Sequence, residues 1–138
     1  MTDDFTECMV TNSRMAARAI TRRYDRYLRG RGFTSTQLSL MAAIRQGPES
    51  TVSELAERRG FDRTTLTRNL DRLEEMALVV SQPARKGNGR ICTVTPQGLA
   101  LIEELLPAWR KAQAEMRDLL SEHGFDMSLQ TLKRLADV

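Results

Sequence analysis

The 138-residue chain has few of the residues on which metal centres and disulfide frameworks depend. It contains two cysteines, one histidine and one tryptophan. Cys8 and Cys92 are too few and too far apart to form a disulfide framework or a metal-binding pair, which indicates a reduced compartment. No apolar run approaches the roughly 18 residues of a membrane span, and the first residues lack the pattern of a secretory signal. We therefore expect no cofactor, no membrane segment and a cytoplasmic location.

Motifs of common catalytic sites are also missing. His123 has no acidic or histidine partner at metal-ligand spacing. The sequence has no phosphate-binding glycine motif, no HExxH and no nucleophile elbow. The acidic pairs Glu74–Glu75 and Glu103–Glu104 are adjacent in sequence, so on a helix their carboxylates point about 100° apart. Such pairs are typical of solvated charges, and we do not expect an enzyme.

What the chain does have is an uneven distribution of charge. The net charge is +3 overall, but residues 58–90 hold eight basic and four acidic side chains, a balance of +4. Residues 97–138 hold five basic and seven acidic side chains, a balance of −2. A locally basic surface attracts polyanions, nucleic acid among them. The alternative is an ordinary solvated face, with which +4 is equally consistent.

Helices are expected on both sides of this basic segment. Apolar spacing predicts one helix over residues 10–30 and a second that starts at a Thr34–Gln37 capping box and stops at Gly47. A third, "TVSELAERRG", begins at Thr51 as N-cap and ends at Gly60.

The stretch "GFDRTTLTRNLDRLEEMALV", residues 60–79, predicts a fourth helix with two different halves. Asp62 is the expected N-cap. A stripe formed by Leu66, Leu70, Leu73 and Ala77 must be buried. The first half places threonines and arginines on the outer side, whereas the second half is acidic.

Two β-branched runs follow, "LVVSQ" (78–82) and "RICTVT" (90–95), around the loop "PARKGNG". They predict a hairpin with a basic tip. Thr95 and Pro96 then open a long helix, in which Pro107 should cause a kink or a break. A last helix over about 127–136 is expected to bury its leucines, Leu129, Leu132 and Leu135.

Two short helices joined by a tight turn, with a polar-tipped second helix, are typical of a helix-turn-helix, whose second helix enters the major groove of DNA. The acidic half would be repelled by phosphate and must point out of the groove. Two alternatives stay open: an exposed helix with merely tolerated threonines, and a winged helix that binds protein and has no salt-dependent affinity for DNA. The expected DNA-binding residues are Thr51, Arg63, Thr64, Thr65, Thr67 and Arg68, with Arg85, Lys86, Asn88 and Arg90 from the hairpin.

The chain resembles the multiple-antibiotic-resistance regulator (MarR) family along nearly its whole length. The strongest matches are "VSELAERRGFDRTTLTRNLDRLEEMALV" and "VTPQGLALIEEL", and "RMAARAITRRYDRYLRGRGFTSTQLSLMAAI" is similar to the family's first two helices. The resemblance implies a mainly α fold with a small two- or three-stranded β wing, in which a winged helix-turn-helix is flanked by N- and C-terminal dimerisation helices.

By the same resemblance, residues 5–31 and 97–138 form the dimerisation region and residues 33–96 the DNA-binding lobe. The implied partners are a second copy of the chain, a pseudo-palindromic duplex with half-sites roughly 10 bp apart and a small-molecule effector. The family's members are often repressors that such a ligand releases from DNA.

Two positions depart from the family pattern. The wing usually carries an Asp-x-Arg pair, where this chain has Lys86 and Asn88, so a minor-groove arginine must come from Arg85 or Arg90 or be absent. The glycine that usually ends the recognition helix is Ala77, which predicts a different path into the first strand. Some family members sense peroxide through a cysteine near the position of Cys8, and a redox switch there is the alternative to a ligand switch.

Overall fold

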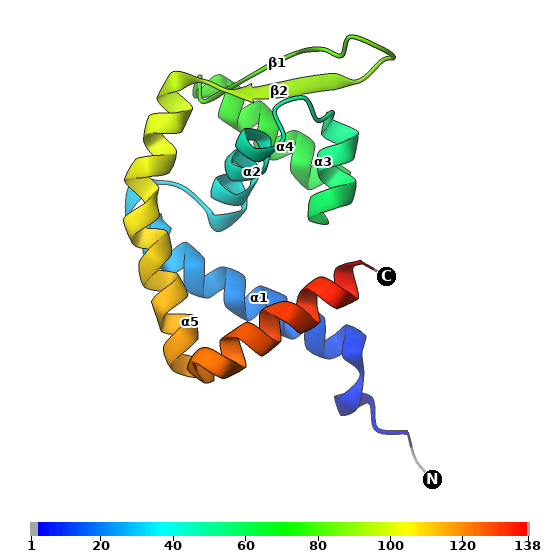
Figure 1. Cartoon of the computed structure of the whole chain (residues 1–138), viewed down its shortest axis with the longest axis vertical. Helices are drawn as coiled ribbons and strands as arrows, with labels where there is room; N and C mark the ends of the chain where they lie inside the picture. Colours follow the sequence, from blue (N-terminus) through cyan, green and yellow to red (C-terminus); the bar gives the residue numbers. More distant parts are fainter. Residues whose placement is uncertain (1–2, 138) are drawn as a thin grey trace.

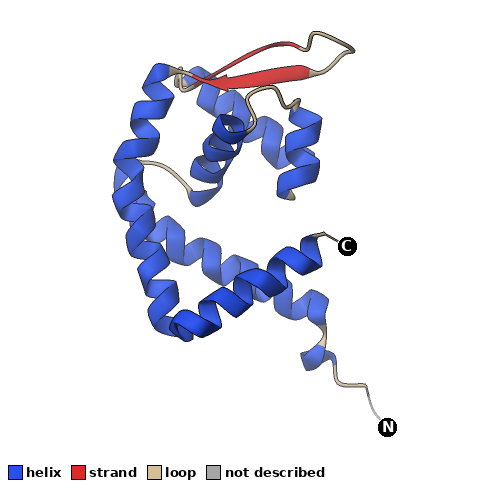
Figure 2. Ribbon diagram, in the orientation of Figure 1, coloured by secondary structure: helices blue, strands red, loops and turns tan. Residues whose placement is uncertain are grey.

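The computed structural model describes residues 3–137, so residue 138 of the predicted dimerisation range lies outside the described residues. Figure 1 shows a lobe in which helices α2, α3 and α4 lie beneath a two-stranded hairpin, and a long helix, α5, that leads from the hairpin to the opposite end of the molecule. Helix α1 crosses α5 there, and helices account for most of the fold (Figure 2). The predicted fold, mainly α with a small β wing, is confirmed.

Helix α1 spans Met9–Leu28 between two 3-10 turns, η1 (Phe5–Glu7) and η2 (Arg29–Arg31). Gly32 follows in the left-handed conformation, with φ of 77°. The helix predicted over residues 10–30 is therefore confirmed, with its end at the glycines that the sequence indicated.

The next two helices begin at the predicted caps. In front of α2 (Ser35–Gln46), the Thr34 hydroxyl accepts from the Gln37 backbone N–H at 3.1 Å, and the Gln37 side chain accepts from the Thr34 N–H at 3.1 Å. In front of α3 (Val52–Arg59), the Thr51 hydroxyl accepts from the Glu54 N–H at 3.2 Å. These bonds satisfy backbone donors that a helix start leaves unpaired.

Helix α4 spans Arg63–Glu75 and starts at Asp62, whose carboxylate accepts from the Thr65 N–H at 3.1 Å. The leucine stripe is buried as predicted, with Leu66, Leu70 and Leu73 at most 1% exposed. Ala77 was wrongly included in that stripe. It lies beyond the helix end, is exposed and adopts φ of 59°, because the chain must turn sharply there to enter the hairpin.

The hairpin pairs β1 (Val79–Pro83) with β2 (Arg90–Val94) in antiparallel register, from Val79 opposite Val94 to Pro83 opposite Arg90. A single bridge between Thr51 and Ile91 stands in place of a third strand. Cys92 on β2 is fully buried, and burial raises the pKa of its thiol.

Helix α5 spans Pro96–Ala136 and starts at Thr95, whose hydroxyl accepts from the Gly98 N–H at 3.0 Å. Of the predicted kink or break at Pro107, the break is wrong, since Pro107 lies inside the helix and the non-helical residue is Ser121, with φ of 66° and ψ of 163°. Proline removes the donor for the Glu103 carbonyl four residues earlier, and both residues are exposed. The sharp bend of α5, drawn in orange, follows at Ser121 (Figure 1).

The last turns of α5 differ from prediction in a second way. Leu129, Leu132 and Leu135 were expected to be buried, but they are 39%, 54% and 51% exposed in the single chain. The leucine spacing correctly indicates an apolar stripe, but within residues 3–137 nothing covers it.

The core lies in the lobe, where residues of α2, α3 and α4 meet the inner side of the hairpin and the first half of α5. Leu28 brings the end of α1 into the same cluster. At Gly98 the backbone of α5 passes so close to the hairpin that a Cβ there would lie 2.3 Å from the Leu78 carbonyl oxygen. Within residues 3–137, no helix has the length and apolarity to cross a membrane.

Candidate nucleic-acid interface

The outer side of the first half of α4 is polar and cationic. Arg63, Thr64, Thr67 and Arg68 are all exposed and, with Asp71, line a shallow hollow of about 440 Å³. Thr64 and Arg68 lie opposite the buried leucines and Thr67 lies on the flank, because the helix has about 3.6 residues per turn. The start of α4 also presents the partial positive charge of its backbone N–H groups. This surface has the chemistry to bind phosphates and the edges of bases.

Thr65 belongs to the same turn but is held differently. It is half-buried, and its hydroxyl donates to the Asp62 carboxylate at 3.1 Å, beside the backbone capping bond. Its hydroxyl is therefore occupied in the cap, whereas Thr64 and Thr67 project outward from the helix.

The acidic half of α4 is tied to the hairpin. The Arg90 guanidinium lies 3.2 Å from a Glu74 carboxylate oxygen and donates to the Ser81 hydroxyl at 2.7 Å. The sequence grouped Arg90 with the hairpin tip, but the structure places it at the start of β2 with its charge paired. The pair neutralises one acid of the helix and joins the base of the wing to α4.

The tip of the wing is the loop of residues 84–89, closed by a 2.7 Å bond from the Ala84 N–H to the Gly89 carbonyl. Arg85, Lys86 and Asn88 are exposed. No carboxylate within residues 3–137 lies within ion-pair distance of Arg85 or Lys86. The tip therefore presents two uncompensated cations.

Thr51 lies beside the base of the tip. Together with Arg85 and Lys86 it lines a second hollow, of about 480 Å³, between the wing and the start of α3. Its hydroxyl donates to the Glu54 carboxylate at 3.1 Å, besides accepting the capping bond from the Glu54 N–H. The structure thus brings Thr51 and the wing cations together at one surface.

Cys8 lies at the other end of the fold, as the residue before α1, whereas the wing is at the top of Figure 1. It is half-buried, and the backbone N–H and the hydroxyl of Thr11 lower the pKa of its thiol. Cys8 is thus separate from the predicted DNA-binding residues. Nowhere in residues 3–137 do three or more His, Cys, Asp or Glu side chains gather as a metal site would need.

A polar cluster that the sequence did not indicate joins α1 to α5. Glu115 accepts from the Tyr27 hydroxyl at 2.7 Å and pairs with Arg23, while the Tyr24 hydroxyl donates to Gln113. The bonds from Tyr27 and Arg23 lower the pKa of the Glu115 carboxyl. These partners lie far apart in the chain, for example 92 positions between Arg23 and Glu115, so no local pattern indicates the cluster.

Comparisons with known proteins identify the family to which this architecture belongs. The sequence model described as MarR family matches residues 31–91. The transcriptional regulator MosR of M. tuberculosis is 35% identical, with 97% of this chain and 98% of MosR covered and a TM-score of 0.81. The chain belongs to the MarR family. A structure of MosR in complex with DNA gives 36% identity, 95% coverage of both chains and a TM-score of 0.80.

More distant MarR-family structures share the fold. BpsR of Bordetella bronchiseptica is 18% identical with a TM-score of 0.85, and the match covers 100% of this chain and 99% of BpsR. A mutant of E. coli MarR, complexed with operator DNA, is 24% identical with a TM-score of 0.80, at 97% and 99% coverage. No curated protein sequence matches significantly. The protein is a MarR-family DNA-binding transcriptional regulator, and its family and fold are those of regulators rather than enzymes.

Proposed function

We propose that the protein is a homodimeric, sequence-specific regulator in which the first half of α4 enters the major groove. The main support is that Arg63, Thr64, Thr67 and Arg68 are all exposed on the first half of α4, with Thr64 and Arg68 on the side opposite its buried leucines. Arg68 is the candidate for a bidentate contact with guanine, and the threonine methyls suit thymine. Thr65, in the first turn of α4, and Thr51, the cap of α3, add contacts near the two helix starts.

The wing contributes a second set of contacts in this proposal. Because Arg90 pairs with Glu74, Arg85 is the remaining arginine at the tip for a narrow minor groove, where arginine is favoured. Lys86 and Asn88 lie beside it and would contact the phosphate backbone. Arg90 then acts by holding the wing against α4 rather than by binding a base.

Dimerisation would use residues 5–31 and 97–138, and residues 33–96 would form the DNA-binding lobe. Support comes from large apolar side chains that are exposed at both ends of the chain, because contiguous exposed apolar surface marks protein interfaces. They are Phe5, Met9, Val10, Met15, Leu119, Met127, Leu129, Leu132 and Leu135.

The regulator would act as a repressor that a small-molecule ligand releases from its operator. For one protein of the same fold, BpsR, regulation of DNA binding by 6-hydroxynicotinic acid is described. The effector of this chain need not be the same compound, because the two proteins are only 18% identical.

Selection of bound sites from random duplex DNA tests the proposal. We expect an inverted repeat with half-sites roughly 10 bp apart and an affinity that falls steeply with salt. A winged helix that binds protein instead would enrich no DNA sequence and show no salt-dependent affinity for duplexes. That result would overturn the proposal.

A redox switch through Cys8 is a second candidate, because the pKa of its thiol is lowered and the thiolate is the form that peroxides oxidise. Operator binding would be titrated with an organic peroxide. The parent protein should lose affinity and Cys8→Ser should keep it. An identical response of both proteins would exclude Cys8 as the sensor.

A further inference from the structure

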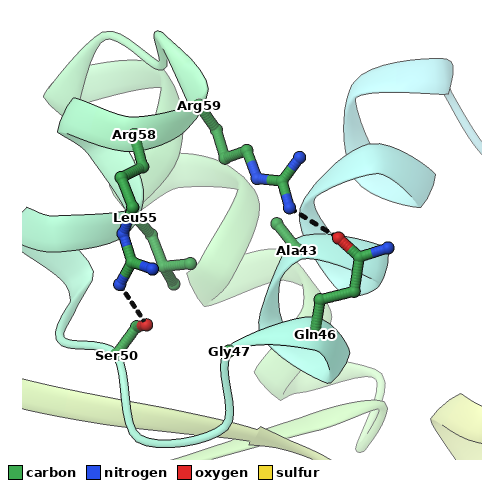
Figure 3. Close-up of a pocket in the computed structure, with 7 residues that line it drawn as sticks. All are labelled: Ala43, Gln46, Gly47, Ser50, Leu55, Arg58 and Arg59. Atoms are coloured by element: carbon green, nitrogen blue, oxygen red, sulfur yellow. Dashed lines mark hydrogen bonds between the residues drawn. The ribbon is translucent and has the colours of Figure 1, made fainter.

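A hollow of about 220 Å³ lies where the end of α2 faces α3, and none of the residues assigned to DNA lines it. It is lined by Ala43, Gln46, Gly47, Ser50, Leu55, Arg58 and Arg59 (Figure 3). A cavity of about 150 Å³ suffices for benzene, so this hollow has room for a somewhat larger molecule.

Two guanidinium groups lie at opposite ends of the hollow, as Figure 3 shows. Arg58 donates to the Ser50 hydroxyl at 2.6 Å and to the Glu54 carboxylate at 3.3 Å. Arg59 reaches in the other direction and donates to the Gln46 side chain at 2.5 Å. Each guanidinium has about five N–H donors, so these bonds leave donors available at both ends.

Between the two arginines the lining is apolar. Ala43 and Leu55 are buried side chains of the facing helices. None of the seven lining residues is acidic, so they carry a charge of +2. The carbonyl end of α2 opposes this with only about half an elementary charge. The hollow therefore offers a cation, a short apolar stretch and a second cation.

Ser50 adds a further polar group at the Arg58 end. It is 6% exposed, and its hydroxyl accepts from Arg58. In the part of the chain that the structure describes, this hydroxyl donates no hydrogen bond of its own. A carboxylate held by Arg58 would supply the acceptor.

We propose that this hollow binds a short aliphatic dicarboxylate, with one carboxylate on Arg58 and Ser50, the other on Arg59, and the methylene chain on Ala43 and Leu55. Guanidinium and carboxylate match in shape as well as charge, because two parallel N–H groups meet two oxygens. Glu54 already makes a contact with Arg58 from outside the lining and competes with the ligand for it.

The site is linked to the DNA-facing surface through one peptide bond. Ser50 precedes Thr51, which caps α3, bridges to Ile91 of the wing and lies against Gly89. A dicarboxylate that binds Ser50 together with Arg58 changes how this turn is held, and with it the position of the wing. This regulatory step rests on the proposed function, because it requires operator binding, whereas ligand binding itself does not.

Calorimetric titration of the full chain without DNA tests the site. The ligands are malonate, succinate, glutarate and adipate, with butyrate as the single-carboxylate match and glutaramide as the neutral match. We expect an optimum within the dicarboxylate series and binding weaker by about tenfold or more for butyrate, since one charge-assisted pair is lost. Glutaramide should not bind.

Variants locate the site. Arg58→Gln and Arg59→Gln should each weaken the best dicarboxylate by about tenfold or more, while Glu54→Gln should strengthen it by removing the competitor. Arg110→Gln, an exposed arginine of α5, is the control and should change nothing. Arg59 is exposed, so Arg59→Gln should fold, and a thermal melt checks this.

The proposal is overturned if no dicarboxylate binds, if butyrate binds equally well, or if the Arg58 and Arg59 variants bind like the parent. Operator affinity is then measured with and without the best dicarboxylate, where a loss of about fivefold or more is expected and should vanish in Arg59→Gln. Unchanged operator affinity refutes the regulatory link. A protein that binds dicarboxylate but no DNA would refute the proposed function and leave the site standing.

Discussion

Arg68 and Arg90 show that the role of an arginine here depends on what lies beside it. Both belong to the basic segment of residues 58–90. Arg90 has Glu74 and Ser81 within hydrogen-bond distance, whereas Arg68 is exposed on α4 and no carboxylate of residues 3–137 pairs with it. The free guanidinium of Arg68 keeps its donors available for the proposed contact with DNA, whereas the paired one of Arg90 joins the hairpin to α4.

Arg68→Ala should reduce operator affinity by about 1–3 kcal/mol, the range for losing a bidentate contact with a base. The measurement is fluorescence anisotropy on the selected operator and on a scrambled duplex. Arg110→Ala, which removes an exposed arginine far along α5, controls for charge alone. Parent-like affinity of Arg68→Ala for the operator would rule out the base contact.

Ala77 lies in the left-handed region, with φ of 59°, where a Cβ costs about 1–2 kcal/mol. Ala77→Gly should therefore stabilise the protein by about 1 kcal/mol, measured by urea denaturation. The matched control is Ala114→Gly in the exposed middle of α5, which should destabilise by about 1 kcal/mol. Equal effects of the two substitutions would contradict a strained turn at Ala77.

At the scale of elements, the helix starts could be predicted because their signals are local. Thr34, Thr51 and Asp62 cap helices through bonds to residues three positions on, and a single sequence contains both partners. The exposed group on α4 follows from the same helical geometry. The hairpin could be predicted in the same way, from two β-branched runs around a glycine-rich loop.

The features that the sequence did not predict depend on contacts between residues far apart in the chain. The Arg90–Glu74 pair joins residues 16 positions apart, and Arg59 meets Gln46 across 13. The place where α5 bends was predicted at Pro107, whereas Ser121 is the residue that leaves helical geometry. Proline removes one backbone donor, and its position alone does not locate a break in a helix.

The wing is the element with the clearest electrostatic role. Lys86→Ala should weaken operator and scrambled duplex alike and lower the salt slope of log affinity by about 1, because a phosphate contact carries no sequence information. Affinities would be compared across a salt series. Lys111→Ala, on the exposed side of α5, is the control. Identical salt slopes for Lys86→Ala and the parent would exclude the phosphate contact.

For the whole molecule, the exposed leucines at the end of α5 belong to the proposed dimer interface. Leu132→Lys should shift the proposed dimer toward monomer, because Leu132 is 54% exposed in the single chain and a charge there would have to be desolvated in an interface. Sedimentation velocity over a dilution series measures this. Val80→Lys alters an aliphatic side chain of the wing that is 55% exposed, and should leave assembly unchanged. Dissociation by both variants, or by neither, would contradict the assigned interface.

The contact at Gly98 has a consequence for how motion passes through the molecule. The space between Gly98 of α5 and the Leu78 carbonyl is too small for a Cβ atom. The long helix is therefore packed directly against the base of the hairpin. A tilt of α5 therefore moves the hairpin with it. In the proposed dimer, a change in the angle between the α5 helices of the two subunits would therefore change the distance between their two hairpins along a duplex.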